Sequence, residues 1–109
     1  MTVNELADKL SLSAIAVPDG DREVSGAYIG DLLSWVMGRA QCDHVWITIM
    51  SNLNIIAVAS LADVSCIVLA EGVTLDETVA NTAVQKGVNV FSTERNAYEI
   101  AVELARLQI

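Results

Sequence analysis

Charged residues are scarce in this sequence, and basic residues are scarcer still. Only 18% of its 109 residues are charged, six are Lys or Arg, and the net charge is −8 at pH 7. Nucleic acids and anionic lipids are bound through clustered Lys and Arg, so this composition argues against both partners. The sequence also lacks an apolar run long enough to cross a bilayer and the basic flank of a signal peptide. We therefore expect a cytoplasmic protein with no nucleic-acid and no membrane partner.

The residue groups that catalysis and metal binding require are missing as well. No Gly-x-x-x-x-Gly-Lys-Ser/Thr motif is present, so phosphotransfer has no phosphate cradle. His44 is the only histidine, and with Cys42 it supplies two ligands where a closed zinc site needs four. Neither cysteine has a neighbouring base in a suitable context, and Cys66 lies in an apolar run where a thiol acts as a small hydrophobe. We predict no catalytic residue, no metal site and no cofactor.

Apolar residues, in contrast, are abundant. They make up 53% of a chain whose length suits one domain with one core. With so little charge to cover its surface, a small domain is expected to bury part of that surface against a partner. The two cysteines fit a reduced compartment.

Strand-like and helix-like segments alternate through the last two-thirds of the chain. Residues 54–62 suit either a buried strand or a buried helix, but strand-like runs flank them, and parallel strands need a crossover that is usually helical. We therefore predict a helix there, and a single three-layer α/β domain with a mostly parallel sheet of four or five strands and helices on both faces. The other predicted helices cover residues 3–10, 32–37 and 74–86 and a segment after residue 96. The predicted strands cover residues 13–17, 45–50, 65–70 and 88–91. Residues 24–29 form a further extended segment, which Gly26 interrupts.

Helix boundaries are predicted from capping residues. Thr2 with Glu5 and Asn96 with Glu99 have the spacing of capping boxes, in which each side chain accepts a hydrogen bond from a backbone N–H at the start of the helix. The same spacing at residues 74–77 predicts a third box, with Thr74 as the cap. Asp31 is suited to cap the helix at residues 32–37, which Gly38 is expected to end in the left-handed conformation.

Polar side chains follow two of the predicted parallel strands. In α/β folds, ligands bind at the carboxyl edge of the sheet, so these residues form a candidate ligand site, although Ser, Thr and Asn also serve constantly as caps and turn formers. Asp31 is a further candidate, since its carboxylate suits a cation or a ligand hydroxyl as well as a helix cap. The complete candidate ligand set is Asp31, Thr48, Ser51, Asn52, Asn54, Ser92 and Thr93.

Trp35 is the residue most informative about association. It extends a broad apolar arc on the predicted helix at residues 32–37, and aromatic residues are enriched at the centres of interfaces. Packing in the core is the alternative, because Trp is often only partly buried. The candidate dimer interface comprises Trp35, Leu32, Val36 and Met37.

The sequence resembles the DRTGG domain family through a combination of segments. These are residues 26–34, 36–37, 45–48, 54–59 and 88–93, together with the turn at residues 71–72 and the capped helix that follows it. The resemblance makes the chain one DRTGG-like domain, with an amino-terminal helix and strand at residues 1–20 and the family core at residues 21–109. It implies a small α/β domain similar to the amino-terminal domain of HPr kinase/phosphorylase. Such domains are also appended to CBS-pair proteins. The resemblance further implies that the domain pairs with a copy of itself, and no catalytic residue is established for the family.

Three residues depart from the family pattern. Trp35 stands at a position that is usually polar or acidic, Met50 where Gln is common, and Asn52 where His is common. If the family binds a ligand through that Gln and His, this chain lacks one side chain and has a neutral amide in place of the other. We therefore expect a non-catalytic homodimeric regulatory or interaction module acting on a protein partner. The alternative is a small-molecule or nucleotide sensor at the carboxyl edge of the sheet, and an enzyme is the least favoured interpretation.

Overall fold

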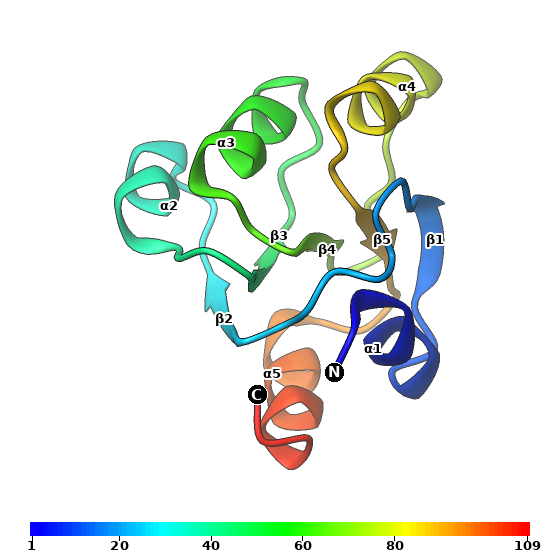
Figure 1. The fold of residues 1–109 in the computed structure, drawn as a ribbon, viewed down its shortest axis with the longest axis vertical. Helices are drawn as coiled ribbons and strands as arrows, with labels where there is room; N and C mark the ends of the chain where they lie inside the picture. The colour runs from blue at the N-terminus through cyan, green and yellow to red at the C-terminus, as the bar shows by residue number, and fades with distance from the viewer.

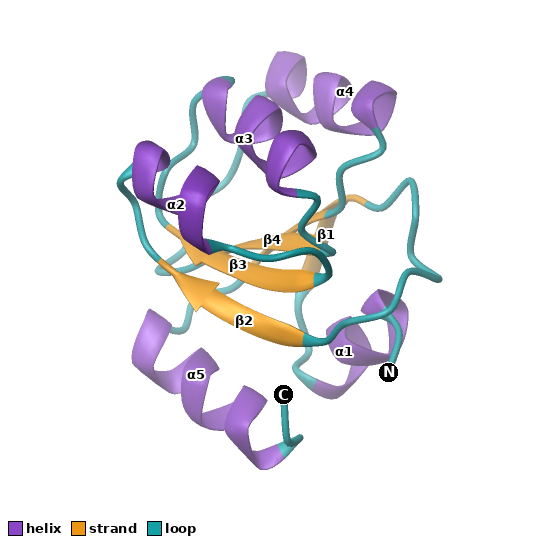
Figure 2. Cartoon of the chain, turned by 60° about the vertical axis from the view of Figure 1, so that its left-hand side comes forward, coloured by secondary structure: helices purple, strands orange, loops and turns teal.

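A five-stranded sheet forms the middle layer of the protein, with helices on both of its faces (Figures 1 and 2). The computed structural model describes all residues, Met1–Ile109. The helices are α1 (Val3–Lys9), α2 (Leu33–Arg39), α3 (Asn54–Ala62), α4 (Glu77–Lys86) and α5 (Ala97–Arg106), and the strands are β1 (Ser13–Ala16), β2 (Gly26–Ile29), β3 (His44–Thr48), β4 (Cys66–Leu69) and β5 (Val90–Ser92).

The strand order across the sheet is β1-β5-β4-β3-β2. Strands β2, β3, β4 and β5 are parallel to one another, and β1 pairs with β5 in the antiparallel direction. Helices α2, α3 and α4 cover one face, and α1 and α5 cover the other (Figure 1). This arrangement confirms the predicted three-layer α/β fold, and the extended segment at residues 24–29 supplies the edge strand β2.

Each face of the sheet carries its own hydrophobic core. Strands β3 and β4 are buried along most of their length because alternate side chains enter opposite layers. Trp46 and Ile67 point toward α2, α3 and α4, whereas Val45 and Val68 point toward α1 and α5. Most of the excess of apolar residues in the sequence is therefore buried between the two faces of the sheet and the helices that cover them.

Several predicted helix boundaries are confirmed. The α3 helix spans Asn54–Ala62 as predicted, so the crossover argument resolves that segment correctly. Capping boxes are present at Thr2 and at Asn96. Gly87 ends α4 with a φ of 72°, in the left-handed region that favours glycine.

Three boundary predictions are wrong. Asp31 does not cap α2, because the cap position is Leu32 and makes no side-chain hydrogen bond. Gly38 lies inside α2, which ends at Arg39; the cap residue Ala40 is extended, so no left-handed residue is needed. The cap of α4 is Asp76, whose side chain accepts from the Val79 N–H, and not Thr74.

A buried amide ties the amino-terminal segment to the sheet. Asn89 is 1% exposed. Its side-chain nitrogen donates to the carbonyl oxygens of Asp19 at 2.8 Å and Ser65 at 2.9 Å, and its Oδ1 accepts from the Asp19 N–H at 2.9 Å. The turn before β2 is therefore held against the start of β5 through one side chain.

None of the helices is long and apolar enough to span a membrane.

Candidate functional site

The carboxyl edge of the sheet brings the predicted polar residues together. Thr48, Leu69 and Ser92 lie in register across β3, β4 and β5, so Thr48 and Ser92 are two strands apart at the same edge. With strands about 4.8 Å apart, their Cα atoms are separated by roughly 10 Å. Both side chains are buried, at 2% and 8% exposed.

Asp31 is fastened to the end of β3. The Thr48 hydroxyl donates to Asp31 Oδ1 at 2.7 Å, and the Ile49 N–H donates to the same oxygen at 3.1 Å. The Thr48 Oγ1 in turn accepts from the Met50 N–H at 3.2 Å. Asp31 thus joins the loop after β2 to the loop after β3, and its exposed carboxylate forms part of the carboxyl edge.

The remaining candidate residues also make local hydrogen bonds. Asn52 Oδ1 accepts from the Asn54 N–H at 3.0 Å, forming a turn at the start of α3. Ser51, Asn52 and Asn54 are exposed. The Thr93 hydroxyl accepts from the backbone and side-chain nitrogens of Arg95, both at 3.3 Å. At these positions the turn-forming and capping role is visible directly.

Arg95 is a member of this edge that no sequence pattern singled out. Its guanidinium forms an ion pair with Glu103 and donates to the Leu10 carbonyl, so its charge is already matched within the protein. The Leu10 contact joins residues 85 positions apart in the chain. No local pattern marks such a pairing, because the partner lies in a distant segment.

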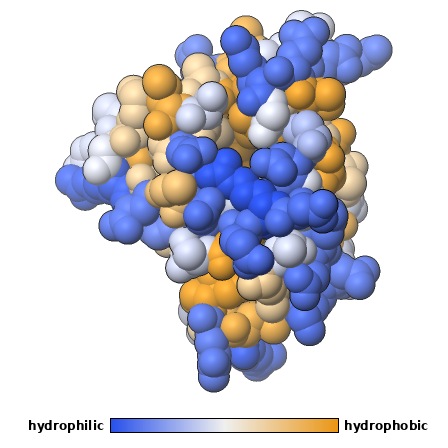
Figure 3. Space-filling view, in the orientation of Figure 1, coloured by the Kyte–Doolittle hydropathy of each residue, from blue (hydrophilic) through white to orange (hydrophobic).

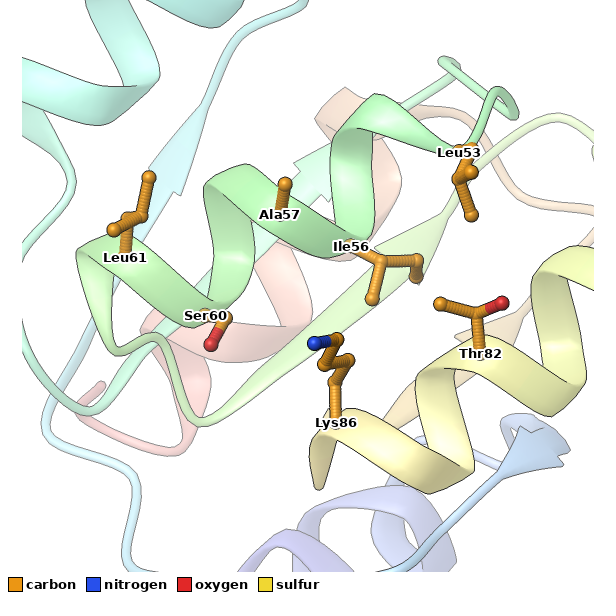
Figure 4. Close-up of a pocket in the computed structure, with 7 residues that line it drawn as sticks. All are labelled: Leu53, Ile56, Ala57, Ser60, Leu61, Thr82 and Lys86. Carbon is orange, nitrogen blue, oxygen red and sulfur yellow. The ribbon is translucent and has the colours of Figure 1, made fainter.

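The most enclosed hollow in the surface lies away from the sheet edge. It is a groove of about 360 Å³ between α3 and α4 (Figure 4). The Lys86 side chain extends into it toward Ser60 and Ile56. No carboxylate lines the groove. Its lining residues are Leu53, Ile56, Ala57, Ser60, Leu61, Thr82 and Lys86.

The apolar composition of α3 indicates this groove in the sequence, although the pattern of polar residues does not. Nearly every residue of α3 is apolar, whereas a helix that covers one face of a sheet needs only one apolar stripe. Leu53 and Leu61 are 51% and 72% exposed because they lie on the outer side of the helix. Figure 3 shows apolar side chains gathered over this part of the surface.

The candidate interface on α2 is divided between surface and core. Trp35, Leu32 and Met37 are 52%, 58% and 48% exposed. Val36, in contrast, is 0% exposed and packs in the core beneath α2, so it has no surface to offer a partner. The Arg39 guanidinium lies over the Trp35 ring, 3.6 Å from its centroid, in cation–π geometry.

Both cysteines have environments that suppress thiolate formation. The exposed Cys42 Sγ donates to Asp63 Oδ2 at 3.2 Å, which raises the pKa of the Cys42 thiol and lowers the pKa of the Asp63 carboxyl. Complete burial raises the pKa of the Cys66 thiol to about 12. Arg22 forms ion pairs with Asp63 and Asp43 beside Cys42. Since the thiolate is the nucleophilic form, this geometry disfavours cysteine chemistry.

The fold and the polar carboxyl edge of its sheet define the chain as a small three-layer α/β domain. Its family is shown by sequence: the DRTGG domain matches residues 33–107, so the chain belongs to the DRTGG domain family. The resemblance noted in the sequence is thereby confirmed. No curated protein matches the chain.

A solved structure shares the fold. It is the crystal structure of the CBS and DRTGG domains of the regulatory region of Clostridium perfringens pyrophosphatase, complexed with its activator diadenosine tetraphosphate. The two superpose with a TM-score of 0.73 at 13% sequence identity, over 94% of this chain. The match covers 45% of the crystallised regulatory region, so the chain spans less than half of the length of that region.

Proposed function

We propose that this DRTGG domain is a non-catalytic regulatory module that works as a homodimer. Membership of the family supports a regulatory role, as does the shared fold with the regulatory region of a pyrophosphatase. The observation that carries the dimer is an exposed apolar surface at the edge of the sheet, which we call the α2–β2 surface. It consists of Leu32 and Trp35 at α2 and Ile29 on β2, each about half exposed. Ile29 pairs with Ile47, so its side chain lies at the same edge but on the face of the sheet opposite α2.

Helix geometry divides the exposed apolar residues of α2 between two sides of the helix. Trp35 and Leu32 lie on one side of the buried Val36, whereas the exposed Met37 lies on the other side, next to Leu33 and Ala40. Burying the exposed half of a Trp removes roughly 100 Å² from water, which is worth about 2.5 kcal/mol. A two-fold contact counts that gain twice, which is a substantial contribution to a dimer of small domains.

Replacing Trp35 with glutamate is expected to weaken self-association by at least about tenfold, because it places a charge where apolar area must be buried. The measurement is the concentration dependence of mass by light scattering after gel filtration. Tyr98→Glu is the matched control, since Tyr98 is 76% exposed on α5 at the opposite face. Equal association of both variants and the unmodified protein would count against the α2–β2 surface.

A second candidate function is the binding of a small molecule or nucleotide. It is favoured by the polar carboxyl edge, by the groove between α3 and α4, and by the activator bound in the related regulatory region. At the edge, Asp31, Thr48, Asn52 and Ser92 would contact the ligand. In the groove, Lys86 would meet an anionic group.

The two locations are distinguished by a thermal-shift screen of nucleotides, acyl phosphates and central metabolites. A ligand at the edge is expected to lose its stabilising effect in Asn52→Ala and Thr48→Ala and to keep it in Lys86→Met. A ligand in the groove should show the reverse pattern. A ligand that stabilises the edge variants as much as the unmodified protein would exclude the carboxyl edge as its site. A screen without hits counts against this second function.

A further inference from the structure

The two edges of the sheet differ in how they are protected. An edge strand exposes unpaired backbone groups, and proteins usually guard it with charges, Pro or a bulge. Strand β1 has an irregular register between Ala14 and Ala16, which disrupts its edge. Strand β2 pairs with β3 in unbroken register from Gly26 to Ile29 and contains neither a charged residue nor Pro.

The outer side of β2 is open. Figure 2 shows β2 at the front of the sheet, with no helix or loop lying across it. The Gly30 N–H donates inward to the Ile47 carbonyl at 3.2 Å. Because successive residues of a strand present their backbone groups to opposite sides, Ala27 and Ile29 direct theirs outward. A further strand would find both donors and acceptors there.

Charge and apolar area around β2 favour a second copy of this chain as the occupant. The chain carries a net charge of −8, so two copies repel one another over most of their surfaces. No residue from Val24 to Gly30 is charged, so the strand itself adds no charge repulsion, and the nearest acidic residues in the chain are Glu23 and Asp31 at its two ends. Ile29 on one face of the sheet and Trp35 on the other are both exposed at this edge, and in a symmetric pair each face meets the same face of the second copy.

We propose that two copies join their β2 strands antiparallel about a two-fold axis. A two-fold axis perpendicular to the sheet reverses one strand relative to the other, so the two paired strands run antiparallel. The two five-stranded sheets then form one continuous sheet, with the α2 helices of both copies on the same face. This inference rests on the proposed homodimer and adds its geometry.

The first test introduces a lysine into each edge strand. Ala27 on β2 and Ala14 on β1 are both exposed alanines, so Ala27→Lys and Ala14→Lys are matched substitutions at opposite edges. We expect Ala27→Lys to weaken self-association by at least about tenfold, because an edge lysine obstructs strand pairing. Ala14→Lys should associate like the unmodified protein. Equal association of the two variants would overturn strand pairing.

The second test needs no substitution in β2. Amide hydrogen exchange of the unmodified protein should show the Ala27 and Ile29 N–H groups protected at high protein concentration and exchanging faster on dilution. Trp35→Glu should expose them at every concentration. A dimeric mass with unprotected amides at these two positions would overturn the strand pairing and leave the homodimer standing, whereas a monomeric mass at all concentrations would overturn both.

Discussion

Trp46→Ala is expected to lower the free energy of unfolding by about 4 kcal/mol, because it truncates the largest fully buried side chain of the protein. Trp46 lies on β3, and its indole N–H donates to the Gly30 carbonyl at 2.9 Å. Truncation leaves a cavity beneath α2 and α3 and releases the loop after β2. Domains of this size are stable by only about 5–15 kcal/mol, so the variant should unfold at much lower urea concentration.

Two controls separate the contributions at this site. Trp46→Phe keeps most of the apolar area but removes the hydrogen bond to Gly30, and a loss of about 1–2 kcal/mol is expected. Tyr98→Ala truncates an aromatic side chain that is 76% exposed and should change stability by less than about 0.5 kcal/mol. A Trp46→Ala loss no larger than that of Tyr98→Ala would contradict the packing described for this face of the sheet.

Asn89→Ala is expected to cost about 2–3 kcal/mol, because it removes three hydrogen bonds at a buried position. The Ser65 carbonyl loses a buried donor, and the turn at Asp19 loses its attachment to the sheet. The Asp19 amide should also exchange faster with solvent in this variant, since its N–H donates to the Asn89 side chain. Urea unfolding and hydrogen exchange measure the two consequences separately.

The matched control is Asn81→Ala, which removes an exposed Asn in the middle of α4. That change should leave stability within about 0.5 kcal/mol of the unmodified protein, because alanine also favours the helix. Similar losses from Asn81→Ala and Asn89→Ala would show that the buried amide does not hold the amino-terminal segment.

Features with local causes were predictable from the sequence. The apolar runs of β3 and β4 indicate strands covered on both faces, and the capping boxes at Thr2 and Asn96 need only residues three positions apart. The α3 helix required one further step, the rule that parallel strands need a crossover. These steps sufficed for the element order and the three-layer arrangement.

Features with long-range causes were not predictable. Asp31 is of a residue type that commonly caps helices, but the hydroxyl of Thr48, 17 residues away, donates to its carboxylate instead. Asn89 and Arg95 act on segments 70 and 85 residues distant, and no spacing in the sequence marks such pairs. Val36 and Trp35 are adjacent and both apolar, and only the position of the sheet decides that Val36 is buried and Trp35 exposed.

The mass of the unmodified protein in solution tests the central claim most directly. Sedimentation equilibrium at micromolar concentration is expected to give twice the chain mass of 11.6 kDa, because the α2–β2 surface and the open edge of β2 are satisfied by a second copy. A mass of 11.6 kDa across that concentration range would contradict the account, since the exposed apolar side chains would then have no partner of their own kind.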